Sequence, residues 1–132
     1  MPLVLDTHAI IWFLSGSSQL SARARSAIEN VERDDDGIFV SAISLVEIIY
    51  LCEKGRLPAE AWERLKAALE DPAGNVVVVP LDAAVARAVQ EVNRGEVPDM
   101  PDRIIAATAA SLKAELVTRD RRLQSSGVRT LW

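Results

Sequence analysis

The sequence predicts an α/β fold, a three-layer α/β/α sandwich around a central, mainly parallel sheet of four to five strands. The first observation is a set of short, wholly apolar runs, which are typical of strands buried on both faces of a sheet. The second is that helical segments separate these runs and are long enough for parallel crossovers. The third is the length of 132 residues with 49% hydrophobic residues, which predicts one domain spanning residues 1–132.

In the amino-terminal half, polar residues and turns between the apolar segments set the predicted boundaries. Serine accepts a backbone hydrogen bond at a helix start, so Ser21 predicts the beginning of a helix. Ser44 and Glu47 have the spacing of a capping box, in which Glu47 reaches back to the backbone N–H of Ser44. The resulting prediction is strands at 3–5 and 38–41 and helices at 8–14, 21–34, 44–55 and 59–69.

The carboxyl-terminal half repeats the alternation of strands and helices. Four consecutive valines, 76–79, predict another strand covered on both faces. Asp82 is a good N-cap for the next helix. Pro101 in a first turn, followed by an alanine-rich body, predicts a helix that packs very close to the sheet. The resulting prediction is strands at 76–79, 116–118 and, at the edge, 127–131, with helices at 82–93 and 101–110.

Charge and cysteine content exclude some classes of function. The net charge of −4, from 15 basic and 19 acidic residues, argues against a protein that coats nucleic acid through a broad basic surface. No segment approaches the roughly 18 consecutive apolar residues of a membrane span, so no membrane partner is expected. Cys52 is the only cysteine, which excludes an internal disulfide and makes a reducing cytoplasm the default location.

Four carboxylates follow strands or open helices at the carboxyl edge of the predicted sheet: Asp6, Glu47, Asp102 and Asp120. Helix capping explains each of them singly, and for Asp6 alone it is an equally good interpretation, but it must be invoked four times. Four carboxylates brought together repel one another and raise their pKa values, and a divalent cation relieves that repulsion. An all-oxygen site suits Mg²⁺ or Mn²⁺. Without a nucleophilic serine or cysteine motif or a P-loop, such a site predicts hydrolysis of a phosphodiester.

The segments around these acids also carry a resemblance to a known family. They are 5–12 (LDTHAIIW), 41–47 with its two serines and Glu47, 102–109 (DRIIAATA) and 116–120 (LVTRD). Over essentially its whole length, the chain resembles PIN-domain ribonucleases, in particular the VapC-type toxins of bacterial and archaeal toxin–antitoxin pairs. The resemblance implies an endoribonuclease dependent on Mg²⁺ or Mn²⁺, an RNA substrate, a homodimer and inhibition by a cognate VapB-type antitoxin. It also implies that the catalytic and metal-binding acids are Asp6, Glu47, Asp102 and Asp120.

Four further residues are candidates to support these acids. Thr118 stands two positions before Asp120 and is a candidate for orienting a metal-bound water, with a plain strand end as the alternative. Thr7 and Ser44 are weaker candidates for the same role. Similar proteins often have proline directly after the acid at the position of Asp99, whereas this chain has methionine there. This departure leaves the role of Asp99 open: a supporting role behind the metal ligands is expected, with direct contact with the metal or the RNA as the alternative.

Arginines beside the acids are candidates for holding substrate phosphates: Arg103 and Arg119, with the neighbouring Arg121 and Arg122. A solvated run of charges is the alternative. Trp12 and Trp62 flank turns and are candidates to line a groove for the antitoxin, although most bulky residues should be core. The remaining alternative for the whole chain is a non-catalytic PIN-like module that only binds RNA or protein. Loss of one of the four acids would mark such a module, and all four are present.

Overall fold

The structure is a computed structural model that describes all 132 residues. It contains one five-stranded sheet with the strand order β3-β2-β1-β4-β5, and every neighbouring pair is parallel. The strands are β1 (Leu3–Leu5), β2 (Ile38–Ser41), β3 (Val76–Val79), β4 (Glu115–Val117) and β5 (Thr130–Leu131). The helices are α1 (Thr7–Ser15), α2 (Ala22–Arg33), α3 (Ala42–Glu53), α4 (Ala59–Glu70), α5 (Ala83–Ala88), α6 (Met100–Leu112) and α7 (Arg121–Gln124), with the 3₁₀ turn η1 (Val89–Glu91) after α5.

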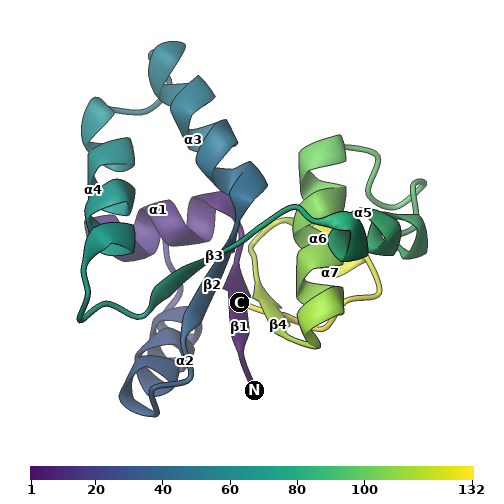
Figure 1. The fold of residues 1–132 in the computed structure, drawn as a ribbon, viewed down its shortest axis with the longest axis horizontal. Helices are drawn as coiled ribbons and strands as arrows, with labels where there is room; N and C mark the ends of the chain where they lie inside the picture. The colour runs from purple at the N-terminus through teal and green to yellow at the C-terminus, as the bar shows by residue number, and fades with distance from the viewer.

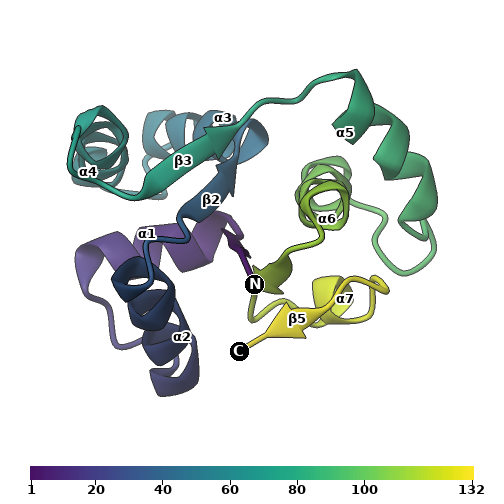
Figure 2. The ribbon, with the colours of Figure 1, turned by 60° about the horizontal axis from the view of Figure 1, so that its bottom comes forward.

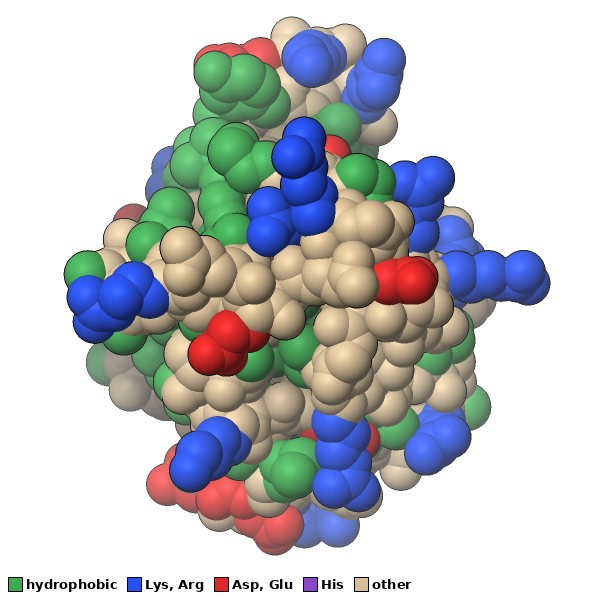
Figure 3. Space-filling view, turned by 90° about the vertical axis from the view of Figure 1, so that its right-hand side faces the viewer, with side chains coloured by type: hydrophobic (Ala, Val, Ile, Leu, Met, Phe, Trp, Pro, Cys, Tyr) green, Lys and Arg blue, Asp and Glu red, His purple; other side chains and the backbone are tan.

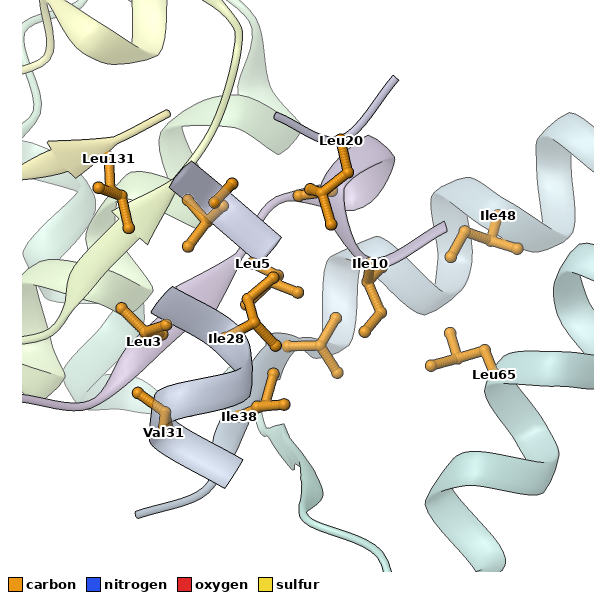
Figure 4. Packing of buried hydrophobic residues seen from close by; sticks show 14 of the residues in the cluster. Leu3, Leu5, Ile10, Leu20, Ile28, Val31, Ile38, Ile48, Leu65 and Leu131 are labelled. Carbon is orange, nitrogen blue, oxygen red and sulfur yellow. The ribbon is translucent and has the colours of Figure 1, made fainter. Parts of the chain in front are cut away.

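The helices form two layers, one on each side of the sheet, which confirms the predicted three-layer fold. Helices α1 to α4 lie on one side, and α5 to α7 lie on the other (Figures 1 and 2). Successive side chains of a strand point to opposite faces, so β1 contributes to both cores. Leu3 and Leu5 belong to the core under α1, α2 and α4, which Figure 4 shows, whereas Val4 belongs to the core under α6. The central strand is therefore buried on both faces.

The alanine-rich helix α6 lies tightly against the second face of the sheet. Every residue from Ile104 to Ala109 is buried, and most of them are alanine or isoleucine. Small side chains allow the helix backbone to approach the strands closely, as the sequence predicts. This packing fixes the start of α6 beside the carboxyl ends of the strands. No helix combines the length and the apolar content that crossing a bilayer requires.

The valine run of β3 departs from its prediction. The sequence predicts a strand covered on both faces, but β3 is an edge strand with only β2 as its neighbour. The side chain of Val77 is 46% exposed, and no residue of the strand is fully buried. Apolar composition alone does not distinguish an edge strand from a central one, because both positions favour β-branched residues.

The start of α3 also differs from its prediction. Ser41, not Ser44, is the N-cap, and its hydroxyl accepts a hydrogen bond from the backbone N–H of Ile43 at 3.2 Å. The helix therefore begins at Ala42, directly after β2. This shift places Glu47 in the second turn, too far along the helix to reach back to its start, so the predicted capping box is wrong.

The strand order creates a crevice at one edge of the sheet. From β1 the chain builds outward through β2 and β3, and it then returns to place β4 on the opposite side of β1. At such a switch point the connections leave in opposite directions, and ligands bind outside the carboxyl ends of the strands. Asp6 directly follows β1, and the segment 118–120 directly follows β4. The topology thus brings the two segments to the mouth of this crevice.

Candidate active site

A pocket of about 670 Å³ opens at the carboxyl edge of β1 and β4. All four acids predicted from the sequence line it, and a fifth acid, Asp99, joins them. The complete lining consists of Asp6, Thr7, His8, Trp12, Gln19, Glu47, Leu57, Asp99, Asp102, Arg119 and Asp120. The fold therefore gathers carboxylates from four distant parts of the chain.

Asp6 is the most enclosed of these acids, with 8% of its surface exposed. One carboxylate oxygen accepts the backbone N–H of Ala9 at 2.8 Å and caps α1. The other accepts a hydrogen bond of 2.5 Å from the hydroxyl of Thr118. Burial raises the pKa of Asp6, while the bonds from Thr118 and Ala9 oppose that shift. The side chain of Asp6 thus both caps α1 and lines the acidic pocket.

Thr118 ties the end of β4 to the end of β1. Its hydroxyl donates to Asp6 and accepts the backbone N–H of Asp120 at 3.0 Å. The residue is fully buried, and its own backbone N–H donates to Leu131 at 3.1 Å. Thr118 does not line the pocket. Its geometry favours a role in holding Asp6 and Asp120 in place over the predicted role of orienting a metal-bound water.

Glu47 is held by a hydroxyl from another helix. Thr7 donates a hydrogen bond of 2.7 Å to Oε1 of Glu47, and it shares a second of 2.9 Å with the hydroxyl of Ser44. Thr7 and Ser44 are buried, whereas Glu47 is half-buried and faces the pocket. Burial raises the pKa of Glu47, and the bond from Thr7 opposes that shift. Thr7 therefore orients the carboxylate, and Ser44 contacts Thr7 instead of capping α3.

Asp99 and Asp102 form the wall of the pocket at the start of α6. Asp99 is the N-cap and accepts the backbone N–H of Asp102 at 3.2 Å. The side chain of Asp102 is half-buried. Burial, followed by the negative charge of Asp99 and then of Asp120, raises the pKa of Asp102 to about 7. A pKa that burial and neighbouring like charges shift this far is typical of residues in functional sites.

Asp120 and Arg119 form the opposite wall. Asp120 is exposed and caps the short helix α7 by accepting the backbone N–H groups of Arg122 at 2.8 Å and Leu123 at 3.1 Å. The sequence does not predict α7, because its arginine-rich segment has no apolar periodicity. The guanidinium of Arg119 lies over the ring of Trp12, 4.5 Å from its centroid.

Arg103 does not reach the pocket, which corrects its predicted contact with substrate phosphates. Its guanidinium donates to the carbonyl oxygens of Val89 at 2.9 Å and Val92 at 3.1 Å. Val89 is the first residue of η1, and its carbonyl also accepts the backbone N–H of Val92 at 3.1 Å, whereas the carbonyl of Val92, just after η1, has Arg103 as its donor. Arg103 therefore anchors the segment before α6. Arg121 and Arg122 also lie outside the pocket lining.

No ion pair within the protein neutralises the five acids, although His8 and Arg119 also line the pocket. The two ion pairs of the structure, Lys66–Glu63 and Arg129–Glu115, involve none of the five acids. Oxygen donors with excess negative charge fit a hard divalent cation such as Mg²⁺ or Mn²⁺. No three acidic side chains converge as a ready-made ligand set. The donor chemistry therefore fits a cation, and its binding requires side-chain movement.

Several features of the site carry no clear signal in the sequence. Gln19 and Leu57 line the pocket from loops, where no periodicity indicates which way a side chain points. The pairing of Trp12 with Arg119 joins residues from α1 and from the segment after β4. The capping role of Asp99 was not predicted, although an aspartate two residues before Pro101 is a good N-cap.

The chain matches the PIN domain family over residues 3–127. It is 35% identical to Ribonuclease VapC22 of Mycobacterium tuberculosis over 127 residues, which cover 93% of this chain and 90% of that protein.

Solved structures share the fold at lower sequence identity. VapBC2 from Rickettsia felis, bound to a DNA fragment from its promoter, matches with a TM-score of 0.70 and 18% identity, over 99% of this chain and 98% of that one. DNA-bound VapBC from Salmonella typhimurium matches with a TM-score of 0.67 and 23% identity, over 99% and 97%. FitAcB from Neisseria gonorrhoeae matches with a TM-score of 0.67 and 22% identity, over 98% and 96%.

Proposed function

The chain belongs to the PIN domain family, and from this premise we propose that it is a metal-dependent endoribonuclease, the toxin of a toxin–antitoxin pair. One observation carries the proposal: five carboxylates line a single pocket at the switch point of the sheet, and none of them forms an ion pair within the protein. The relative from Mycobacterium tuberculosis, a ribonuclease by name, supports RNA as the substrate. An RNA substrate and a single cysteine both agree with action in the cytoplasm.

The acids that would hold Mg²⁺ or Mn²⁺ are those predicted from the sequence: Asp6, Glu47, Asp102 and Asp120. A bound divalent cation would supply activation of water and stabilisation of the leaving oxygen in phosphodiester hydrolysis. The protein orients two of these acids, since Thr118 holds Asp6 and Thr7 holds Glu47, and side-chain movement would complete the ligand set around a cation. Preorganised ligands lose little freedom when they bind a cation, so these hydroxyls support the site without being ligands themselves.

The proposed protein partners are a VapB-type antitoxin and a second copy of the chain. The VapBC structures that share the fold support a VapB-type partner for a chain of this shape. Trp12 and Leu57 provide apolar surface in the pocket beside the acids, which suits a peptide segment that would block the site. Val46 and Tyr50 lie one turn apart on α3 and are 48% and 58% exposed, so this helix offers apolar surface to a second copy.

The direct test is cleavage of RNA by the purified protein. Labelled single-stranded and structured RNAs are incubated with Mg²⁺, with Mn²⁺ and with EDTA, and the products are separated on a gel. Cleavage that requires a divalent cation is expected for the wild type and not for Asp102→Asn. If the wild type produces no more product than Asp102→Asn under every condition, the chain is a non-catalytic PIN-like module.

A further inference from the structure

We propose that Trp12 holds the guanidinium of Arg119 at the rim of the pocket, where Arg119 binds a backbone phosphate of the RNA beside the cleaved bond. This inference rests on the proposed function, and it adds a substrate-binding residue and a positioning residue outside the set of acids. It starts from a contact between α1 and the segment after β4, in which the guanidinium carbon of Arg119 lies 4.5 Å from the ring centroid of Trp12.

Arg119 is the only lysine or arginine among the eleven residues of the pocket. The whole chain carries a net charge of −4, and the pocket contains five carboxylates. A polyanionic strand approaching this pocket is repelled unless a local cation contacts its phosphates. On the face that carries α5, α6 and α7, lysine and arginine side chains project singly instead of forming one basic patch (Figure 3). Arg119 is therefore the cation best placed for the strand near the acids.

Arg119 remains available for a ligand although acids surround it. It takes part in neither ion pair of the structure, and its side chain is exposed. A guanidinium above an aromatic ring interacts through its charge, which leaves its N–H groups free to donate to other acceptors. Two phosphate oxygens can accept two parallel N–H bonds from one arginine, and such charge-assisted hydrogen bonds are stronger than bonds between neutral groups. The pairing with Trp12 thus keeps the guanidinium from folding onto the acids.

Trp12 is itself fixed, so it can position Arg119. Its ring packs against the ring of His8, 5.5 Å away, and edge-on against the ring of Trp132, 5.9 Å away. The tryptophan is also half-buried against the core under α1. The backbone of Arg119 is restrained on both sides, because Thr118 is bonded to Asp6 and Asp120 caps α7. Both partners of the contact are thus anchored at the pocket rim.

The test measures RNA binding in a background that does not cleave. In Asp102→Asn protein with Mg²⁺, fluorescence anisotropy gives the affinity for a short, labelled, single-stranded RNA of mixed sequence. Arg119→Gln is expected to weaken binding about tenfold, because one charge-assisted contact is lost. It should also reduce the slope of log affinity against log salt by about 0.7, the value for one phosphate of a single strand. The matched control is Arg122→Gln, an exposed arginine three residues away and outside the pocket.

The role of Trp12 is tested by a double-mutant cycle. Trp12→Leu should weaken RNA binding about threefold when Arg119 is present, the size of an exposed cation–π contact, and should have little effect once Arg119 is glutamine. Trp12→Phe retains an aromatic face and should restore most of the affinity. If Trp12→Leu costs the same in both backgrounds, Trp12 acts on the RNA directly and the positioning role is wrong.

The outcome also separates this inference from the proposed function. If Arg119→Gln and Arg122→Gln bind RNA equally well while the wild type cleaves RNA, the Trp12–Arg119 inference is wrong and the nuclease assignment stands. If the wild type cleaves no RNA with either cation, the proposed function itself fails.

Discussion

Thr7 and Glu47, 40 positions apart in the sequence, are joined by a hydrogen bond of 2.7 Å at the edge of the acidic pocket. The bond links the first residue of α1 to the second turn of α3. It replaces the capping box predicted from the sequence, and it gives Glu47 an orientation that does not depend on the start of its own helix. The conformation of Glu47 therefore depends on how two helices pack.

Glu47→Gln tests whether the negative charge of this residue is needed for activity without disturbing its hydrogen bond to Thr7. Glutamine keeps an oxygen that accepts the bond from Thr7 but removes the negative charge. RNA cleavage should fall roughly a hundredfold or more, because a cation loses a charged ligand, whereas the melting temperature should change by only a few degrees. Product formation and thermal unfolding are measured on the same preparation. Glu53→Gln, at the exposed end of α3, is the control, and wild-type activity in Glu47→Gln would return Glu47 to a structural role.

Substitution of Thr7 should reveal its effect on cation binding. Thr7→Val keeps the shape of the side chain but leaves Glu47 without its donor, whereas Thr7→Ser retains the hydroxyl. The affinity for Mn²⁺, measured by calorimetric titration without RNA, should fall about tenfold in Thr7→Val, the size of a lost outer contact to a metal ligand, and recover in Thr7→Ser. Equal affinity in the valine and serine variants would show that the hydroxyl has no such role.

The raised pKa of Asp102 predicts how stability without metal depends on pH. Burial and the neighbouring carboxylates raise its pKa from the ordinary 3.8 to about 7 in the folded protein. As the pH rises between these values, the unfolded chain loses the proton first, so the free energy of unfolding decreases across this window. Asp102→Asn removes this contribution and should melt at a temperature a few degrees higher than the wild type at pH 8 in EDTA.

The measurement is a series of melting curves from pH 4 to pH 8 in EDTA. The raised pKa values of Asp6 and Glu47 add to the same slope, so Asp102→Asn should flatten the dependence without abolishing it. Asp36→Asn, in the exposed turn before β2 and away from the pocket, should follow the wild type. Parallel curves for the wild type and Asp102→Asn would contradict the burial and charge effects assigned to this acid.

The main features of the fold could be predicted because they follow from local patterns. A wholly apolar β1 that stops at Asp6 indicates both a buried strand and the edge at which it ends. The choice between Ser41 and Ser44 as N-cap could not be predicted, since either serine caps well. It depends on the extent of β2, which pairs with β3 as far as Ser41 opposite Val79. That register is a long-range property of the sheet.

The direction in which a long side chain points could not be predicted from the sequence either. Arg103 and Arg119 each stand next to an acid of the site, so their sequence neighbourhoods predict the same role. In the fold, Arg103 turns to the carbonyls before α6, whereas Arg119 turns to the ring of Trp12. Which partner an arginine finds depends on the carbonyls and aromatic faces within its reach, and these come from other segments.

Arg103→Gln should therefore lower stability without removing a substrate contact. Glutamine is too short to reach the carbonyls of Val89 and Val92, so the part-buried carbonyl of Val92 loses its donor, at a cost of about 1–3 kcal/mol, whereas that of Val89 keeps the backbone N–H of Val92. The melting temperature should fall by several degrees. RNA affinity in the Asp102→Asn background, measured well below the melting temperature, should stay within about twofold of the parent. Arg94→Gln, which removes the same charge from the exposed loop before α6, controls for charge alone. A loss of RNA affinity in Arg103→Gln as large as that in Arg119→Gln, with no change in melting temperature, would restore Arg103 as a phosphate ligand.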